Sequence, residues 1–296
     1  MNRIPAELAV TLATALDEGT LEAAARRLHI TPSAVSQRIK TLEETVGRVL
    51  LVRTKPLRAT EAAHGIVRYA RQLALLEADA VAAMGGDGVV SVPLAVNADS
   101  LATWFLPPLA RLAARHRVVF DLHRDDQDFT AGLLESGTVM GAVTSRAQPV
   151  AGCRVSPLGE LVYEAVATPA FRDRWFAGAA IQDALRHAPL IDFDRRDDLQ
   201  TRWLAANGAD PLEPPRHRVP ASHDFATAVQ SGLGWALLPR LQSSEALRGG
   251  SLVLLDGADE SAIAVPLYWQ QWNLRSPLLD AVAEEIVDEG RRVLVR

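Results

Sequence analysis

The stretch AAARRLHITPSAVSQRIKTLE, residues 23–43, carries the clearest structural signal in the amino-terminal part of this 296-residue chain. Within it, Thr31 suits a helix N-cap and Pro32 suits the first helical position, where a missing N–H costs nothing. Apolar residues then recur four, three and four positions apart, at Val35, Ile39, Leu42 and Val46. This spacing places them on one side of a helix. The stretch therefore predicts a short helix, a turn near His29 and a second helix with one buried face.

The opposite face of the second helix is polar and carries no carboxylate. With 100° per residue it gathers Ser33, Ser36, Gln37 and Lys40, with Arg38 on its flank. Such groups reach base edges and phosphates in a major groove without repelling the DNA backbone. A plain solvated face is the alternative. DNA is favoured because the acidic residues Glu43 and Glu44 begin only where the polar face ends.

The flanking segments complete a winged helix-turn-helix. Leu8, Leu12 and Leu16 mark a first helix that ends at Gly19, and Thr20 suits the N-cap of the next. Downstream, an apolar run, a basic turn and a second strand predict a wing along a phosphate backbone. We therefore expect DNA contacts from Thr31, Ser33, Ser36, Gln37, Arg38, Lys40, Arg53, Lys55 and Arg58.

A linker helix is predicted after the wing, over residues 61–88, with Thr60 as its N-cap. Its apolar residues alternate three and four apart, as in a heptad seam of about two and a half repeats. The alternative is a helix packed on its own body. Dimerisation is favoured because it accounts both for the apolar seam and for a DNA-binding domain, since two paired domains of this kind read two paired DNA half-sites. The expected seam consists of Ile66, Tyr69, Leu73, Leu76 and Ala80.

The remaining residues, 89–296, alternate apolar runs with helical segments, which predicts parallel strands with crossover helices. Two sets of such elements are joined by two apolar strands, at 161–167 and 263–269. Two connections between two lobes describe a hinged sensor. The predicted class is α+β multidomain: a winged helix-turn-helix (1–60), a linker helix (61–88) and a two-lobe α/β effector domain, with lobe I at 89–163 and 266–296 and lobe II at 164–265.

Ligands of open α/β sheets bind outside the carboxyl ends of the strands. Those ends offer hydroxyl groups for a carboxylate and surplus carboxylates for a cation, which suits lysine, arginine or histidine. Aspartate also favours strand ends and N-caps for structural reasons, and that alternative covers about half of these residues. The candidate effector residues are Asp99, Ser100, Asp125, Asp126, Thr144, Asp194, Ser222 and Asp224.

Residues 23–43, the wing at 51–60 and the segment 60–65 together resemble the signature of LysR-type transcriptional regulators. Pro32 departs from it, because many members carry glutamine there. The resemblance implies a DNA operator, a homodimer often assembled into a homotetramer, and RNA polymerase as a further candidate partner. It also implies an effector domain similar to periplasmic solute-binding proteins.

Segments 96–104, 125–127, 139–144, 222–225 and 268–269 resemble the branch of that family that controls lysine and arginine exporters. By this resemblance, Ser100 and Thr144 hold the α-carboxylate of the effector. The resemblance also implies that Asp99, Asp126, Asp194 or Asp224 binds the amino groups of the effector. The sequence does not rank these four residues. The alternatives are a LysR-type regulator of another small metabolite and a nucleoid-type DNA-binding protein without an effector.

Other classes lack their sequence features. We find no G-x-S-x-G elbow, phosphate-binding loop or dinucleotide fingerprint, so an enzyme is not expected. The histidines lack metal-ligand spacing, and the single cysteine, Cys153, excludes an internal disulfide. We expect no cofactor and no metal. No signal peptide or membrane span is recognisable, which predicts a cytoplasmic protein without a membrane partner.

Overall fold

The computed structural model describes residues 3–124, 130–178, 180–255 and 262–295. The chain forms two compact units. Unit 1 comprises Met1–Val96, Leu109–Ser156 and Trp269–Glu285, and unit 2 comprises Asn97–Pro108, Pro157–Tyr268 and Ile286–Arg296.

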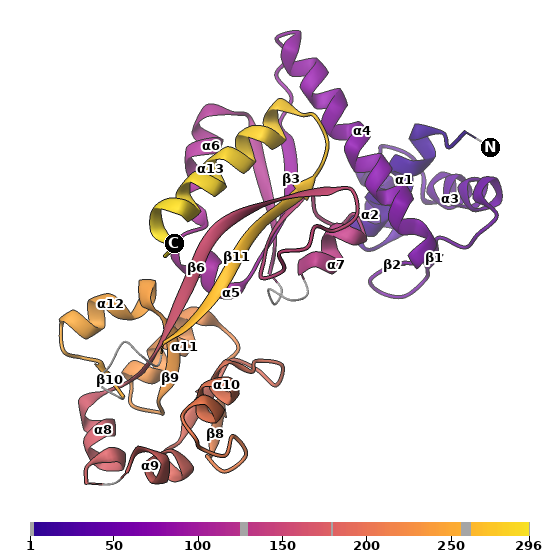
Figure 1. Cartoon of the computed structure of the whole chain (residues 1–296). Coiled ribbons are helices and arrows are strands. Elements are labelled where there is room, and N and C mark those ends of the chain that lie inside the picture. Colours follow the sequence, from indigo (N-terminus) through magenta and orange to yellow (C-terminus); the bar gives the residue numbers. More distant parts are fainter. Residues whose placement is uncertain (1–2, 125–129, 179, 256–261, 296) are drawn as a thin grey trace. The chain divides into compact units, whose positions relative to one another are not determined.

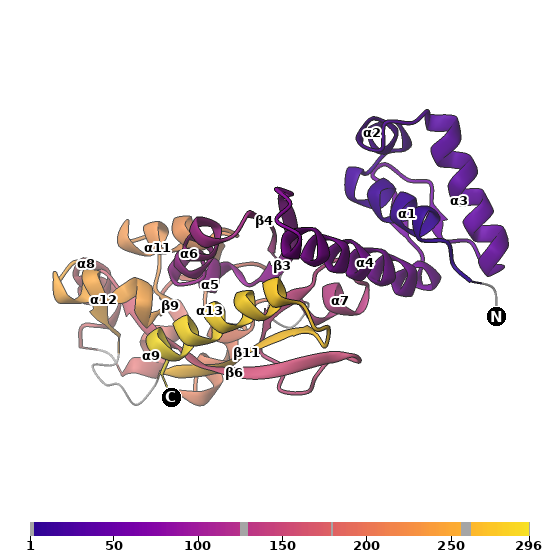
Figure 2. The same ribbon diagram turned by 90° about the horizontal axis from the view of Figure 1, so that it is seen from above.

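Unit 1 begins with the winged helix-turn-helix, the head. Its helices are α1 (Ala6–Glu18), α2 (Leu21–Arg27) and α3 (Pro32–Val46), and a two-stranded wing follows, β1 (Leu51–Val52) and β2 (Arg58–Ala59), as Figures 1 and 2 show. The predicted caps of α2 and α3 are confirmed. Thr20 Oγ1 accepts from the Ala23 N–H at 3.1 Å, and Thr31 Oγ1 accepts from the Ala34 N–H at 3.2 Å.

The head buries a small aliphatic core. Leu12, Val35 and Leu42 are fully buried in it, as predicted for the inner faces of α1 and α3. Glu43, which we placed beyond the reading face, has a structural role: its Oε1 accepts the N–H of Leu50 at 2.8 Å and that of Leu51 at 3.3 Å. One carboxylate thereby fixes the start of the wing against the end of α3.

The linker helix begins later than expected. A short 3-10 turn, η1 (Glu61–Ala63), precedes α4 (His64–Ala83). The prediction that the Thr60 side chain caps this helix is wrong, because its hydroxyl donates instead to the Val49 carbonyl at 2.8 Å. Tethering Thr60 to the wing leaves the first turn without a side-chain cap. The first turns of α4 also complete the core of the head, through Ile66, Val67 and Ala70.

Farther along, α4 packs against two turns of unit 1. The Arg68 guanidinium donates to the carbonyls of Ala151 at 2.9 Å and Gly152 at 2.7 Å, and it lies 5.5 Å from the ring centroid of Trp272. Gly137 has φ +73°, and a Cβ there would lie 2.8 Å from the backbone nitrogen of Arg68. The close approach therefore requires glycine at this turn.

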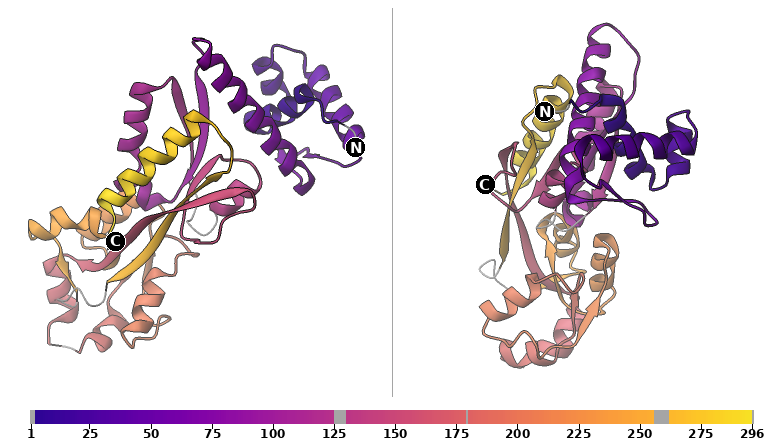
Figure 3. Two further views of the ribbon diagram at one scale, coloured as in Figure 1. Left: turned by 45° about the horizontal axis from the view of Figure 1, so that its top comes forward. Right: turned by 90° about the vertical axis from the view of Figure 1, so that its right-hand side faces the viewer.

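Three strands of unit 1 pair in parallel, as predicted, within a mixed seven-stranded sheet. β3 (Val90–Val96) pairs in parallel with β4 (Val118–Arg124) and with β5 (Gly141–Thr144). α7 (Thr130–Glu135) lies in unit 1, whereas α6 (Leu106–Arg115) and the carboxyl-terminal α13 (Pro277–Val293) belong in part to each unit. Two long neighbouring strands, β6 (Cys153–Ala167) and β11 (Ile263–Trp272), belong in part to each unit (Figure 3). The two apolar strands expected at 161–167 and 263–269 are thus present within β6 and β11.

Unit 2 holds the second set of elements. β9 (Ala236–Pro239) and β10 (Val253–Leu254) are antiparallel to β6, while β7 (Leu190–Asp192) pairs in parallel with β8 (Arg216–Arg218). The mixed seven-stranded sheet has the order β10-β6-β11-β5-β3-β4, with β9 also paired to β6. Trp203 and Trp235 are fully buried, with ring centroids 5.0 Å apart. The helices are α5 (Ala98–Thr103), α8 (Pro169–Phe176), α9 (Ile181–His187), α10 (Leu199–Ala206), α11 (Ser222–Gln230) and α12 (Arg240–Arg248).

Candidate nucleic-acid interface and effector site

The outer face of α3 is open to solvent. Thr31, Ser33, Gln37 and Lys40 are exposed and Ser36 is half-buried. The Thr31 and Ser33 hydroxyl oxygens lie 2.9 Å apart, so the capping residue also orients its neighbour. Lys40 Nζ lies 3.8 Å from Glu44, within reach of an exposed ion pair that costs little to break. The polar side chains predicted on this face are therefore open to solvent or partly so.

Arg38 is placed differently from the rest of the predicted face. Its guanidinium pairs with Glu7 of α1 and lies 3.5 Å from the Thr11 hydroxyl, and its side chain is only 29% exposed. It therefore joins α3 to α1. A contact from Arg38 to a phosphate would have to compete with Glu7.

The wing presents three exposed cations, Arg53, Lys55 and Arg58. In the described part of the chain, none of them forms an ion pair. The turn between them is held from within, because the Thr54 hydroxyl donates to the Pro56 carbonyl at 2.7 Å. The Leu57 N–H donates to the Gly19 carbonyl at 2.9 Å, which ties the wing to the turn after α1. The charges are thus carried by a fixed loop.

The predicted seam on α4 is divided between two environments. Ile66 is buried in the core of the head, whereas Tyr69, Leu76 and Ala80 are exposed and Leu73 is half-buried. Val81 and Met84 extend the exposed apolar surface toward the end of the helix. From Tyr69 onward, α4 therefore presents apolar side chains that the described part of the chain leaves exposed.

Among the candidate effector residues, Asp99 has the most defined surroundings. It lies in the first turn of α5 and is half-buried. Tyr163 of β6 donates its hydroxyl to Oδ2 at 2.8 Å, and Ser222 of α11 donates to Oδ1 at 2.7 Å. Burial raises the pKa of Asp99 above its ordinary value, and these two hydrogen bonds oppose the rise. Three elements distant in sequence thus meet at one carboxylate.

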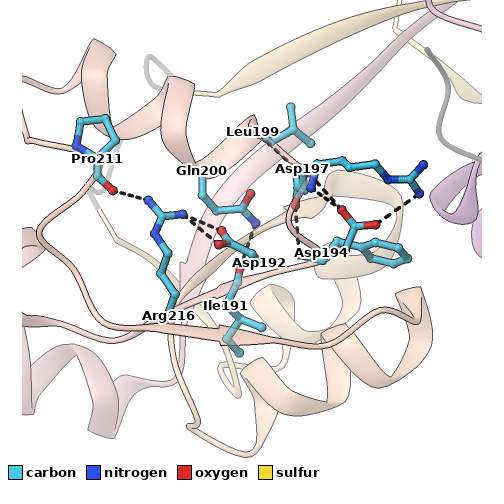
Figure 4. A network of polar contacts seen from close by, with 10 residues as sticks. Ile191, Asp192, Asp194, Asp197, Leu199, Gln200, Pro211 and Arg216 are labelled. Carbon is cyan, nitrogen blue, oxygen red and sulfur yellow. Dashed lines mark hydrogen bonds and ion pairs between the residues drawn. The ribbon is translucent and has the colours of Figure 1, made fainter. Parts of the chain in front are cut away.

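Two further carboxylates of unit 2, Asp192 and Asp197, take part in a network of polar contacts (Figure 4), and the charges of Asp192 and Asp99 both act on Asp197. Asp192, at the end of β7, receives Arg216 Nη1 at 2.9 Å on each oxygen. Asp197 accepts the N–H groups of Phe193 and Leu199, both at 3.1 Å. Burial raises the pKa of Asp197 to about 6, and the negative charges of Asp192 and Asp99 contribute to the rise.

The other predicted residues are distributed more widely. Asp194 organises its own turn: partial burial would raise its pKa, but the N–H groups of Arg196 and Asp197 and the Arg196 charge lower it overall. Asp224 is exposed in the first turn of α11. Asp125 and Asp126 lie outside the described residues.

Two predicted hydroxyl groups are buried. Thr144 Oγ1, at the end of β5 in unit 1, accepts the Arg146 N–H at 3.1 Å. Ser100 Oγ in unit 2 has no hydrogen-bond partner among the described residues. An unsatisfied buried hydroxyl is costly, so a partner supplied from outside would be favourable there.

An open groove of about 440 Å³ lies beyond the ends of β7 and β8. It is lined by Phe193, Asp194, Arg195, Arg196, Arg218 and Pro220. Three arginines against one aspartate make it basic, in contrast to the acidic region around Asp99.

Sequence reasoning did not identify Tyr163 or Asp197. Tyr163 lies inside an apolar strand run, where a tyrosine is usually a core residue, and its partner is 64 positions away in the chain. Asp197 belongs to a run of charged residues after β7 that is typical of a solvated loop. The only available signal was its place just beyond a strand end.

Two family models together match nearly the whole chain. Residues 7–64 match the bacterial regulatory helix-turn-helix of the lysR family, and residues 90–291 match the LysR substrate binding domain. The chain therefore belongs to the LysR family of bacterial transcriptional regulators and is a DNA-binding regulator with a small-molecule-binding domain.

Within this family, the chain is similar over nearly its whole length to regulators named LysG and ArgP. The lysine export transcriptional regulatory protein LysG of Corynebacterium glutamicum is 42% identical over 288 residues, which cover 95% of this chain and 97% of LysG. A crystal structure of ArgP from Mycobacterium tuberculosis matches with a TM-score of 0.85 and 41% identity, covering 98% of each chain. A structure of full-length LysG from C. glutamicum with bound effector arginine matches with a TM-score of 0.78 and 38% identity. The match covers 99% of this chain and 100% of that chain.

No helix among the described residues is long and apolar enough to cross a membrane. Likewise, the described ranges contain no group of three or more histidine, cysteine, aspartate or glutamate side chains able to hold a metal ion.

Proposed function

We propose that this protein regulates transcription in response to a cationic amino acid, lysine, arginine or histidine, and that it controls a gene for the export of basic amino acids. Similarity to a lysine export regulator and to a structure holding arginine supports the effector class. Because the target is chromosomal DNA, we place the protein in the bacterial cytoplasm.

The observation that carries the proposal is the set of partners of the Asp99 carboxylate, which receives hydroxyl groups but no cation from the described part of the chain. Two other buried carboxylates of unit 2 are paired with arginine: Asp192 with Arg216, and Glu164 with Arg240 at 2.7 Å. Asp99 has only neutral hydroxyl donors, and in the described part of the chain no lysine or arginine pairs with it. Asp99 is half-buried and its carboxylate is largely withdrawn from water, so a cation beside it would stabilise the charged form. We infer that the effector supplies that partner.

Asp99 is therefore the first of the four aspartates that we assign to an amino or guanidinium group. Asp194 is already engaged by its own turn, and Asp224 is exposed, so both rank below it. For the α-carboxylate of the effector we retain Ser100, whose hydroxyl lacks a partner among the described residues, and Thr144.

On the DNA side, we propose that the exposed face of α3 reads bases and that the wing cations follow a phosphate backbone. Tyr69, Leu73, Leu76 and Ala80 would pair two protomers, with further assembly into a tetramer. Effector binding then shifts the population between arrangements of the paired heads on the operator. RNA polymerase would be the partner through which an activated promoter responds.

The direct test is calorimetric titration of the full-length protein with lysine, arginine, histidine, leucine and glutamate. We expect saturable heats for basic amino acids alone. Asp99→Asn should weaken binding at least tenfold, because it removes the charge that the ligand compensates. Asp173→Asn, the same change at an exposed position of α8, is the matched control and should leave affinity unchanged.

Other outcomes are equally clear. Binding of leucine or glutamate alone would replace the cationic effector with a different metabolite. Absence of binding by all five would refute the effector class. Equal affinity of the Asp99→Asn variant and the wild type would remove Asp99 from the site.

A further inference from the structure

The position of Tyr163 is fixed by the strand that carries it. Tyr163 is only 2% exposed. It lies opposite Pro239 in the antiparallel pairing of β6 with β9. Strand pairing fixes the backbone, burial restricts the ring, and a tyrosine has few rotatable bonds to order. The hydroxyl is thereby held 2.8 Å from Asp99 Oδ2.

Ser222 completes the arrangement from the opposite oxygen, at 2.7 Å from Oδ1. It begins α11, and its own backbone carbonyl accepts the side-chain amide of Gln242 at 3.2 Å. Each carboxylate oxygen thus receives one hydroxyl. A carboxylate offers about four lone-pair sites, so each oxygen keeps an acceptor site for a ligand.

We propose that Tyr163 is a positioning residue for the effector: together with Ser222 it holds the Asp99 carboxylate ionised and in one orientation for the cationic group of the ligand. This inference rests on the proposed function. Hydroxyl donors suit the task because they stabilise the ionised carboxylate without neutralising it, whereas an arginine partner would cancel the attraction for a cation.

The charged groups around Asp99 are compatible with this role. Asp197 adds negative charge from the loop after β7, and Asp192 is balanced by Arg216. His223 and Asp224 follow Ser222 in the first turn of α11, and both are exposed. In the described part of the chain, Tyr163 and Ser222 are therefore the groups that oppose protonation of Asp99.

The test is titration with L-arginine of wild type, Tyr163→Phe and Tyr268→Phe, at pH 6.0 and pH 8.0. Tyr163→Phe removes one hydroxyl and keeps the ring. We expect it to weaken binding roughly tenfold at pH 6.0 and by less at pH 8.0, because a higher pH by itself favours the ionised carboxylate that the hydroxyl stabilises. Tyr268→Phe makes the same change on β11 and should bind as wild type does. Ser222→Ala should repeat the pattern of Tyr163→Phe.

The ratio of the two dissociation constants is the informative quantity, because the titrations of Asp197 and of the ligand are common to both proteins and cancel. A ratio of one at both pH values would refute the role of Tyr163. A loss that is equal at both pH values would also overturn the proposal, since a general loosening of the fold does not depend on the ionisation of Asp99.

The outcome separates this inference from the proposed function. If the wild type binds basic amino acids and Tyr163→Phe binds equally well, only the positioning role fails. If the wild type binds none of them, both fail.

Discussion

Asp197 accepts two backbone hydrogen bonds, yet its pKa is raised to about 6. The two N–H groups favour the charged form, but burial and the neighbouring charges of Asp192 and Asp99 outweigh them. Because the folded pKa lies above the ordinary value of 3.8, the native state binds more protons than the unfolded state between about pH 4 and 6. Through this group alone, the free energy of unfolding decreases as pH rises through that window.

The same group predicts proton release on effector binding. Near pH 6 about half of the Asp197 carboxyls are protonated, and an arriving cation favours the ionised form. We expect binding of arginine to release protons at pH 6 and few at pH 8, with weaker affinity at the lower pH.

Calorimetry in buffers of different ionisation enthalpy measures this release. Asp197→Asn should remove part of it at pH 6 and change little at pH 8. If the observed enthalpy at pH 6 is the same in every buffer, the cation does not affect Asp197.

At the scale of elements, α3 should separate base reading from phosphate contact. Gln37 is exposed on its outer face, and amides pair with adenine in a major groove. Gln37→Ala should relax discrimination at one base position of the operator by about 1–3 kcal/mol. Relative affinities measured across a set of operator variants report this directly. An unchanged ranking of the variants would exclude base reading by Gln37.

The wing should contribute to DNA affinity without distinguishing between base sequences, in contrast to Gln37. Arg53 is exposed and lies outside any ion pair in the described residues, so it can bind a phosphate without first breaking an internal contact. Arg53→Ala should weaken binding to all sequences and reduce the slope of log affinity against log salt by about one. Binding curves at several salt concentrations test this, and a loss confined to one operator would contradict it.

Regular elements were predictable because their signals are local. The helix expected after Thr31 is α3, and the strands expected at 161–167 and 263–269 lie within β6 and β11. Partnerships between distant side chains left no such signal. Arg38 has the position of a DNA-contacting residue but pairs with Glu7, and Tyr163 resembles a core residue although it holds Asp99. Such pairs depend on which elements meet, and one sequence does not reveal that.

At the scale of the whole molecule, the exposed side of α4 should join two protomers. Leu76 is 42% exposed, and Tyr69 and Ala80 lie on the same side of the helix. Leu76→Glu would bury a charge in the proposed seam and should weaken the dimer at least tenfold. Sedimentation velocity over a range of concentrations measures this change.

Ala74→Glu is the matched control, because Ala74 is exposed on the opposite side of α4, about 160° around the helix. It should leave the dimer intact. Equal sedimentation of the Leu76→Glu variant and the wild type would move the interface elsewhere.

The contribution of α4 to the core of the head limits how this protein can be divided. A fragment ending at residue 60 would lose Ile66, Val67 and Ala70, and would expose the apolar surface that they cover on α1. A reading module transplanted onto another sensor must therefore carry the first turns of α4, with the joint placed after Ala70. Any exchange of sensor domains at that joint would also inherit the exposed face of α4, so the graft would bring its own pairing preference with it.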